Sequence, residues 1–204
     1  MQSIWFGRVE SIFGTEEERE QLLEYTKAAA EFAHALECRN MVFGSPKNRN
    51  LPEGADAHSA VEFFHRLGEI AKEQDAVIAM EANPPIYNTN YINDTKAALL
   101  LVKQVSHPGF LLNLDAGTMI ENGEQINVIE ADTGCIHHVH ISEPFLAPIE
   151  ERALHRDIFA MLKKAEYQGY VSIEMKGGEG FLRIARCMEY VNALNREVLS
   201  KAAL

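Results

Sequence analysis

The sequence has few cysteines, and none of them forms a pair that would bind a metal or exchange disulfides. Its 204 residues include only Cys38, Cys135 and Cys187, which are odd in number and far apart. Structural disulfides form in oxidising compartments, whereas a Cys-x-x-Cys pair would indicate a zinc or redox site. We therefore expect a reduced, cytoplasmic protein whose three thiols are inert packing residues.

Long apolar runs and an excess of basic residues are also missing. No apolar run approaches the roughly 20 residues that span a bilayer, and no signal peptide opens the chain. Thirty acidic against nineteen basic residues give a formal net charge of −11. Such a surface repels phosphate backbones. The composition thus argues against nucleic acid and membranes as partners.

What the sequence does contain is a regular alternation of short apolar runs with longer amphipathic segments, which is typical of βαβ units and a parallel sheet. We predict six strands, at residues 3–7, 41–43, 77–80, 110–114, 136–141 and 171–173. Thr15 with Glu18 forms a capping box at the start of one helix, and Asp94 caps another that runs to about Val105. Further helices are predicted near residues 61–71, 118–133, 150–166 and 181–199. No linker or break in composition interrupts residues 1–204, so we predict a single domain.

Each of the last four predicted strands ends on a residue that can bind a metal ion. These residues are Glu81, Asp115, His140 and Glu174. The carboxyl ends of the strands of a parallel β/α barrel converge on one face, where active sites form. Three carboxylates would repel one another there unless a cation lay between them. One imidazole with three carboxylates suits Mn²⁺, Mg²⁺, Co²⁺ or Zn²⁺. The sequence therefore predicts one divalent-metal site, although polar residues also end strands simply where the chain meets water.

Four short motifs around these residues resemble those of the xylose isomerase-like TIM barrels, and most of all the sugar-phosphate isomerase/epimerase and ketose 3-epimerase branch. The motifs are Glu81-Ala82-Asn83-Pro84, Leu114-Asp115-Ala116-Gly117, His138-Val139-His140 and Ser172-Ile173-Glu174. The resemblance covers about residues 3–199. It implies a TIM-barrel-type fold, four metal ligands at Glu81, Asp115, His140 and Glu174, and an acid–base pair formed by Glu81 and Glu174.

The sequence departs from that family in two respects. The family barrel has eight strands, whereas about six βα units are predicted here, as if the first two strands were absent. Unpaired edge strands are usually covered, so we expect a homo-oligomer. The ketose 3-epimerases also carry a histidine three residues after the aspartate ligand and an arginine six residues after the histidine ligand. Thr118 and Leu146 occupy those positions here, so no ketohexose substrate is assigned.

The residues also indicate a reaction. A proton beside a carbonyl group is very weakly acidic, and its removal requires stabilisation of the developing enediolate, which a chelated divalent ion supplies. Two carboxylates on opposite sides of the substrate can then remove and return the proton. Return to the same carbon is epimerisation and return to its neighbour is isomerisation. The sequence does not distinguish between the two reactions, nor does it identify the sugar or its phosphorylation.

Further charged residues follow the predicted strands and are candidates for binding the substrate. Lys47 and Arg49 could meet a phosphate or carboxylate, although a solvated loop is an equal interpretation. Glu143 and Lys176 could contact sugar hydroxyls, or form salt bridges at the rim of the site. His138 lies on the same strand face as His140 and is predicted to be a hydrogen-bonded interior residue.

Two other functions stay open. One is phosphodiester cleavage, as in the apurinic endonucleases of this fold. That chemistry uses additional histidines, including one where Thr118 stands, and the acidic net charge opposes it. The other is a non-catalytic barrel remnant that binds metal or sugar without turnover.

Overall fold

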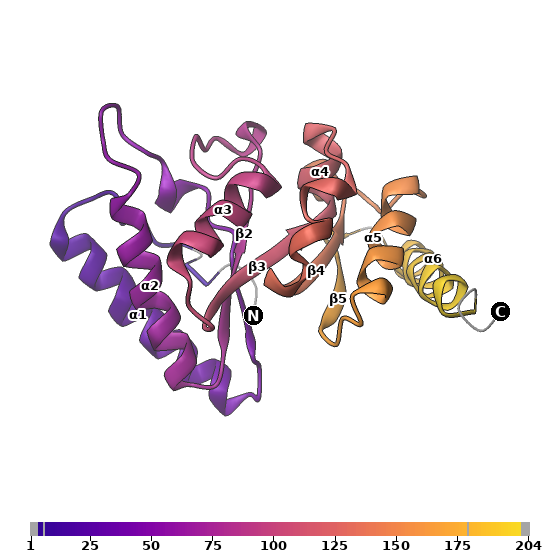
Figure 1. The fold of residues 1–204 in the computed structure, drawn as a ribbon, viewed down its shortest axis with the longest axis horizontal. Helices are drawn as coiled ribbons and strands as arrows, with labels where there is room; N and C mark the ends of the chain where they lie inside the picture. The colour runs from indigo at the N-terminus through magenta and orange to yellow at the C-terminus, as the bar shows by residue number, and fades with distance from the viewer. Residues whose placement is uncertain (1–3, 6, 179, 201–204) are drawn as a thin grey trace. The chain divides into compact units, whose positions relative to one another are not determined.

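The computed structural model describes residues 4–5, 7–178 and 180–200, with only the backbone for 198–200. The chain divides into two compact units, Met1–Asn113 and Leu114–Leu204, which are described in turn. Along the whole chain short strands alternate with helices, as the sequence predicts (Figure 1).

The described residues of the first unit form three α-helices, two 3-10 helices, the strands β1 and β2, and most of β3. Its elements are α1 (Glu16–Ala35), β1 (Asn40–Phe43), η1 (Lys47–Arg49), α2 (Ser59–Glu73), β2 (Val77–Glu81), η2 (Pro85–Tyr87), α3 (Thr95–Val105) and β3 (Phe110–Asp115). β1 pairs with β2 and β2 with β3, both in parallel. The predicted caps are confirmed: Thr15 and Glu18 form the capping box of α1, and Asp94 accepts a hydrogen bond from the Ala97 amide.

Helices α1 and α2 pack against each other and lie beside the strands of this unit (Figure 1). Aromatic side chains fill its core. Phe43, Phe64 and Phe110 are fully buried and in ring contact, with 5.3 Å between the ring centroids of Phe43 and Phe64. Trp5 packs edge-on against Phe43 at 4.6 Å. Its indole N–H donates to Thr26 Oγ1 at 2.8 Å, which fixes the entering chain on α1.

The first predicted strand, residues 3–7, is not a strand in the described residues. Ile4, Trp5 and Gly7 lie in turns, while Ser3 and Phe6 fall outside the described residues. Trp5 is buried and Gly7 has a φ of +84°, a left-handed conformation that bends the chain. The apolar run therefore serves as a core anchor. The described part of the chain has five strands where the sequence predicted six.

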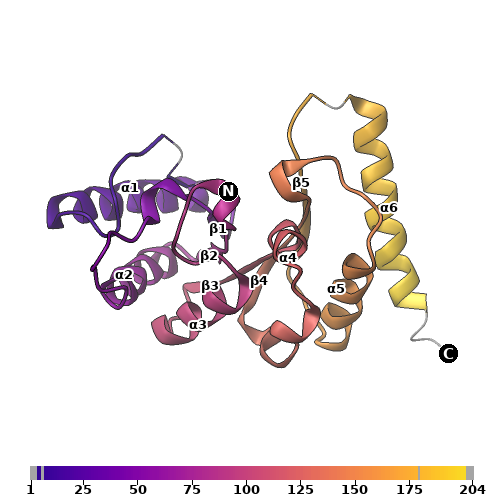
Figure 2. The same cartoon turned by 90° about the horizontal axis from the view of Figure 1, so that it is seen from above.

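The second unit begins at the end of β3 and contains the last two strands (Figure 2). Its elements are α4 (Ala116–Asn122), η3 (Ile126–Val128), η4 (Glu130–Cys135), β4 (Ile136–Ser142), η5 (Pro144–Leu146), α5 (Ala153–Lys164), β5 (Tyr170–Glu174) and α6 (Phe181–Ser200). β4 and β5 are parallel, and α5 packs against α6. The helix predicted within residues 118–133 is in fact α4 followed by two 3-10 segments, because Gly123 ends α4 in a left-handed conformation.

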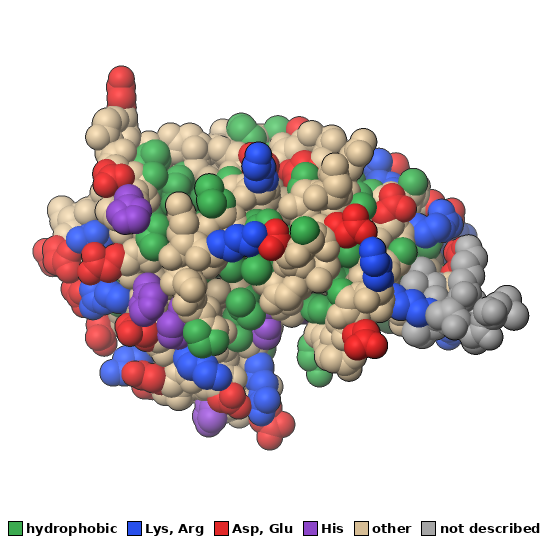
Figure 3. All heavy atoms as spheres, in the orientation of Figure 1, with side chains coloured by type: hydrophobic (Ala, Val, Ile, Leu, Met, Phe, Trp, Pro, Cys, Tyr) green, Lys and Arg blue, Asp and Glu red, His purple; other side chains and the backbone are tan. Residues whose placement is uncertain are grey.

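Hydrogen bonding orders the strands β1-β2-β3-β4-β5, the order of the sequence, as βα units require. The three cysteines are free thiols. No helix among the described residues is long and apolar enough to cross a membrane. Acidic and basic side chains are intermixed over the helices α1 and α2 in the space-filling view (Figure 3), so the acidic net charge does not conceal a basic patch on that face.

Candidate metal centre

Three of the four predicted ligands lie together in the second unit. Asp115, His140 and Glu174 stand at or near the carboxyl ends of β3, β4 and β5, and each offers a ligand atom within 4.8 Å of the others. His140 Nδ1 lies 3.2 Å from Glu174 Oε2. The His140 side chain is 5% exposed and that of Glu174 22%. His140 is therefore more deeply buried than Glu174.

The carboxylate of Asp115 is held by hydrogen bonds on both oxygens. Oδ1 accepts from the Thr118 amide at 2.6 Å, so Asp115 is the N-cap of α4. Oδ2 accepts from Ser142 Oγ at 2.5 Å, and the same Oγ accepts from the Gly117 amide at 2.8 Å. A Cβ on Gly117 would stand 2.7 Å from Ser142 Oγ, so glycine is required for this close approach. The carboxylate is thus oriented by the protein.

One face of β4 carries three polar residues at alternate positions, His138, His140 and Ser142. The rings of His138 and His140 lie 5.2 Å apart at 84°. His138 is buried, and its Nε2 lies 2.9 Å from Ser172 Oγ on β5. This is the hydrogen-bonded interior histidine that the sequence predicted, one layer below His140.

Glu81, the fourth predicted ligand, ends β2 in the first unit and is 6% exposed. Two amide groups donate to its carboxylate. Asn113 Nδ2 lies 2.6 Å from Oε2, and Asn83 Nδ2 lies 3.3 Å from Oε1. Gly44 leaves room for the carboxylate, because a Cβ there would stand 2.6 Å from Oε1. The side chain is therefore buried, hydrogen-bonded and fixed in direction.

Arg49 lies behind Glu81 and is fully buried. Its Nη1 donates to the backbone oxygen of Glu81 at 2.7 Å, and its Nη2 donates to Asn83 Oδ1 at 2.5 Å. Burial lowers the pKa of Arg49 to about 10, although the nearby Glu81 and Tyr91 act in the opposite direction. The expectation that Arg49 meets a substrate anion is wrong, because its guanidinium is used inside the protein. Lys47, two residues earlier, is exposed.

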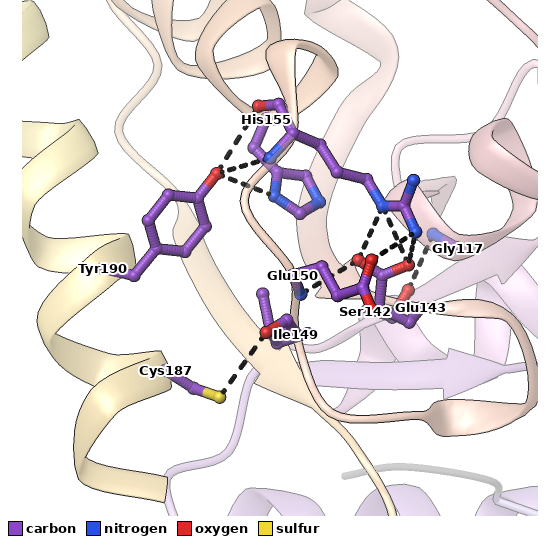
Figure 4. Close-up of polar contacts among 9 residues, drawn as sticks. Gly117, Ser142, Glu143, Ile149, Glu150, His155, Cys187 and Tyr190 are labelled. Carbon is purple, nitrogen blue, oxygen red and sulfur yellow. Dashed lines mark hydrogen bonds and ion pairs between the residues drawn. The ribbon is translucent and has the colours of Figure 1, made fainter. Parts of the chain in front are cut away.

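Glu143, predicted to contact substrate, forms a two-pronged ion pair with Arg152 (Figure 4). Arg152 Nε and Nη2 lie 2.7 Å and 2.6 Å from the two carboxylate oxygens, and the Glu150 amide donates to Oε1 at 3.1 Å. This carboxylate is 3% exposed and raises the pKa of Arg152. The Lys176 side chain is exposed, and its amide donates to the Leu146 oxygen.

Tyr190 of α6 ties that helix to the start of α5 (Figure 4). Its hydroxyl accepts from the Arg152 amide at 3.0 Å and lies 3.2 Å from His155 Nδ1. Burial lowers the pKa of His155, with a smaller contribution in the same direction from Arg152. A cavity of about 680 Å³ between α5 and α6 includes Tyr170, at the opposite end of β5 from Glu174. That cavity is therefore separate from the candidate ligands.

Two residues that hold the candidate ligands were not predicted from the sequence. Asn113 is the only polar residue inside the apolar stretch of β3 before Asp115, and Ser142 stands two residues after His140. Both positions carried a signal, since alternate residues of a strand share a face. Asn113 shares its face with Asp115, and Ser142 shares its face with His140.

Comparison with known proteins gives a family match over most of the chain. The model of the family described as xylose isomerase-like TIM barrel matches residues 6–197. No curated protein matches the chain.

Solved structures resemble the chain in fold. A 3-keto-D-glucoside 4-epimerase from E. coli has a TM-score of 0.74 at 16% identity, with 92% of this chain and 76% of that chain covered. A D-psicose 3-epimerase from Clostridium cellulolyticum H10 has a TM-score of 0.70 at 14% identity, covering 95% and 74%. A family 2 AP endonuclease from Brucella melitensis has a TM-score of 0.69 at 22% identity, covering 88% and 72%. At such identities these similarities establish a TIM-barrel-type fold and no particular activity.

Proposed function

Because the chain belongs to the xylose isomerase-like TIM barrel family, we propose that it is a divalent-metal-dependent isomerase or epimerase acting on a sugar or sugar phosphate. The observation that carries the proposal is the cluster of Asp115, His140 and Glu174 at the ends of neighbouring strands. Epimerases are among the solved structures that share the fold.

In this proposal the metal ligands are Glu81, Asp115, His140 and Glu174. The donor set fits a divalent cation, because carboxylate oxygens and one imidazole suit Mn²⁺, Mg²⁺, Co²⁺ or Zn²⁺. The pre-oriented carboxylate of Asp115 supports the same assignment, since ligands of metal sites are held by surrounding hydrogen bonds. Glu81 is held in the same manner by two asparagine amides.

The protein's own residues would then move the proton. A bound divalent ion would act as a Lewis acid that lowers the cost of forming the enediolate. Glu81 and Glu174 would act as the acid–base pair, one removing the proton beside the carbonyl and the other returning it. Return to the same carbon from the opposite face gives the epimer, and return to the adjacent carbon gives the isomer. His140, whose Nδ1 lies 3.2 Å from Glu174 Oε2, would keep that carboxylate in place.

Contacts with the rest of the substrate are proposed for Lys47, Glu143 and Lys176. The two exposed ammonium groups suit a phosphate or hydroxyl groups. Glu143 would act with Arg152, whose guanidinium is bound to it in the fork geometry that fixes both side chains. Thr118 is 2% exposed and stands where the ketose 3-epimerases carry a histidine. No ketohexose substrate is therefore assigned.

We also propose a single barrel-type domain, a homo-oligomer and a cytoplasmic location. The free cysteines fit a reducing compartment. Edge strands need cover, which a second copy of the chain would provide for β1 and β5. Phosphodiester cleavage is not favoured, in spite of the AP endonuclease neighbour, because Thr118 replaces a required histidine and the net charge is −11.

The deciding experiment is solvent-deuterium exchange into a panel of ketoses and ketose phosphates with Mn²⁺. We expect exchange at a carbon beside the carbonyl of one substrate, abolished by a chelator and by Glu174→Gln. Mn²⁺ binding without exchange into any sugar would favour the non-catalytic binder. If the protein does not bind Mn²⁺, Mg²⁺, Co²⁺ or Zn²⁺, the metal-site assignment is wrong.

A further inference from the structure

We propose that Arg49 is a positioning residue for Glu81, acting through the side-chain amide of Asn83. All three residues belong to the first unit. The inference deepens the proposed function and depends on it in one respect, which is the assignment of Glu81 as a metal ligand.

Burying the guanidinium of Arg49 costs free energy. A guanidinium is among the most expensive groups to bury, and replacing buried ionic groups with apolar ones often stabilises a protein. Arg49 is 0% exposed, its Nε has no hydrogen-bond partner, and its guanidinium lies 5.8 Å from the ring of Phe43. An apolar side chain would suit that environment better. The apolar surroundings therefore do not account for arginine at this position, and its role lies with the polar groups that it contacts.

Arg49 also determines which way the side-chain amide of Asn83 is oriented. The two ends of an asparagine amide have nearly the same shape, so its orientation is set by its partners. A guanidinium can only donate, and Arg49 Nη2 lies 2.5 Å from Asn83 Oδ1. The amide oxygen must therefore face Arg49. The NH₂ group is consequently directed away, toward the Ala82 oxygen at 3.0 Å and Glu81 Oε1 at 3.3 Å.

The orientation of Asn83 in turn helps to hold the carboxylate of Glu81. With Asn83 directed in this way, the Glu81 carboxylate accepts an amide hydrogen bond on each oxygen, from Asn83 on Oε1 and from Asn113 on Oε2. These two donors fix the direction of the carboxylate. Arg49 also fixes the backbone at the same residue, by donating to the Glu81 oxygen at 2.7 Å. A flipped Asn83 would instead place its oxygen against the carboxylate and push it out of position.

The test compares Mn²⁺ affinity with stability in two variants of the full chain. Arg49→Met keeps much of the length of the stem and removes every donor, whereas Arg49→Lys keeps a donor-only group. We expect Arg49→Met to weaken Mn²⁺ binding by roughly 10- to 100-fold, the usual effect of removing a residue that supports a ligand. Arg49→Lys should recover most of this loss. Unfolding in urea measures the stability of the same variants, and the order of Mn²⁺ affinities should not follow the order of stabilities once the control variant below is included.

The matched control is Asn48→Ala in the same 3-10 helix. Asn48 is also buried and donates to the Arg8 and Glu10 oxygens, without a link to Glu81. The Asn48→Ala variant should be less stable than the parent, and its Mn²⁺ affinity should stay within about twofold of the parent's. In addition, Asn83→Ala should weaken binding, and the double variant should bind no more weakly than Arg49→Met alone, because Arg49→Met already removes the path through Asn83.

The outcomes separate this inference from the proposed function. If the parent binds Mn²⁺ and Arg49→Met binds it within twofold, the positioning role is wrong and the metal site stands. The same holds if affinity follows stability across the lysine, methionine and Asn48→Ala variants. If the parent does not bind Mn²⁺, the metal site and the role of Arg49 both fail.

Discussion

Asn113 donates its side-chain amide to Glu81 Oε2 across 2.6 Å, and the two residues lie opposite each other in the register of β3 and β2. Asn113 is 1% exposed and Glu81 6%, so this polar pair is buried in the first unit. Neighbouring positions of β3 are occupied by leucine. The hydrogen bond between Asn113 and Glu81 therefore belongs to the folded structure at the end of the strand. Replacing these two residues tests whether Glu81 contributes to stability or to metal binding.

We predict that Asn113→Leu destabilises the protein and weakens Mn²⁺ binding, because it leaves a buried carboxylate oxygen without its donor. The expected loss of stability is about 1–3 kcal/mol. Replacing both partners, as Glu81→Leu with Asn113→Leu, should restore much of the stability, since paired polar groups can be replaced together at little cost. Mn²⁺ binding should stay lost in the double variant. Urea unfolding and calorimetry measure the two effects, and a double variant that still binds Mn²⁺ would exclude Glu81 as a ligand.

Glu174→Gln tests the proposed acid–base role. The amide is close in shape to the carboxylate, so the fold and some metal affinity should survive, while the side chain can no longer accept the proton. Loss of a general base typically lowers turnover by about 10²–10⁴-fold. The measurement is deuterium exchange into the substrate identified from the sugar panel. Turnover within twofold of the parent would refute the role.

Gly117→Ala should damage the support of Asp115. The new Cβ would stand 2.7 Å from Ser142 Oγ and 3.1 Å from the backbone carbon of Glu143, so the backbone must move. Overpacking of this kind costs about 1–3 kcal/mol. Gly134→Ala is the matched control, because a Cβ there meets nothing within 4 Å. Equal melting temperatures for the two variants would contradict the close approach at Gly117.

The buried His155 predicts how stability depends on pH. Its folded-state pKa is lowered by burial, and by Arg152, against the opposing effect of Glu143. The unfolded chain therefore binds a proton more readily, so this contribution to stability is present above about pH 6.5 and is lost as the pH falls below it. His107, whose pKa is also lowered by burial, acts with the same sign.

Urea unfolding at about pH 7.5 and about pH 5.5 measures this effect, on either side of the ordinary histidine pKa. The parent should lose stability at the lower pH. His155→Gln should lose less, keeping the part that His107 contributes. His34→Gln, at an exposed position, should behave like the parent. An unchanged pH dependence in His155→Gln would show that His155 does not titrate on unfolding.

Light scattering tests the expected homo-oligomer. β1 and β5 are the first and last strands of the sheet order, and Tyr170 in β5 and Phe181 at the start of α6 are 78% and 82% exposed. Exposed strand edges and apolar side chains favour association. We expect a dimer that Phe181→Glu weakens. A stable, monodisperse monomer at every accessible concentration would show that the edges need no partner.

The sequence predicted the helices and strands best where periodicity was reinforced by a local signal. The capping box at Thr15 and the N-cap Asp94 are confirmed because these bonds form between residues three apart. Ile4 and Trp5 were wrongly predicted to lie in a strand, because a short apolar run has the same pattern whether it forms a strand or a core anchor. The burial of Trp5 and its bond to Thr26 are long-range facts that no window of sequence contains.

Part of the candidate site could also be predicted from the sequence. Strand ends carry their residues to one edge of a sheet, so Asp115, His140 and Glu174 could be grouped without coordinates. The destination of Arg49 could not be predicted, because an exposed and a buried arginine look alike in a loop sequence. Its neighbour in the same 3-10 helix, Lys47, is exposed. Only the folded chain separates the two cations.

Asp115 both ends β3 and begins α4. The bonds that hold its carboxylate, from Thr118 and Ser142, are made entirely within the protein. α4 can therefore start at the same residue whether or not an ion is present, and losing an ion would not unwind it. A cation could then be exchanged for another at the surface of an already folded protein. Under the proposed function, the metal at this site would therefore depend on the supply in the protein's surroundings rather than on the conditions under which the chain first folded.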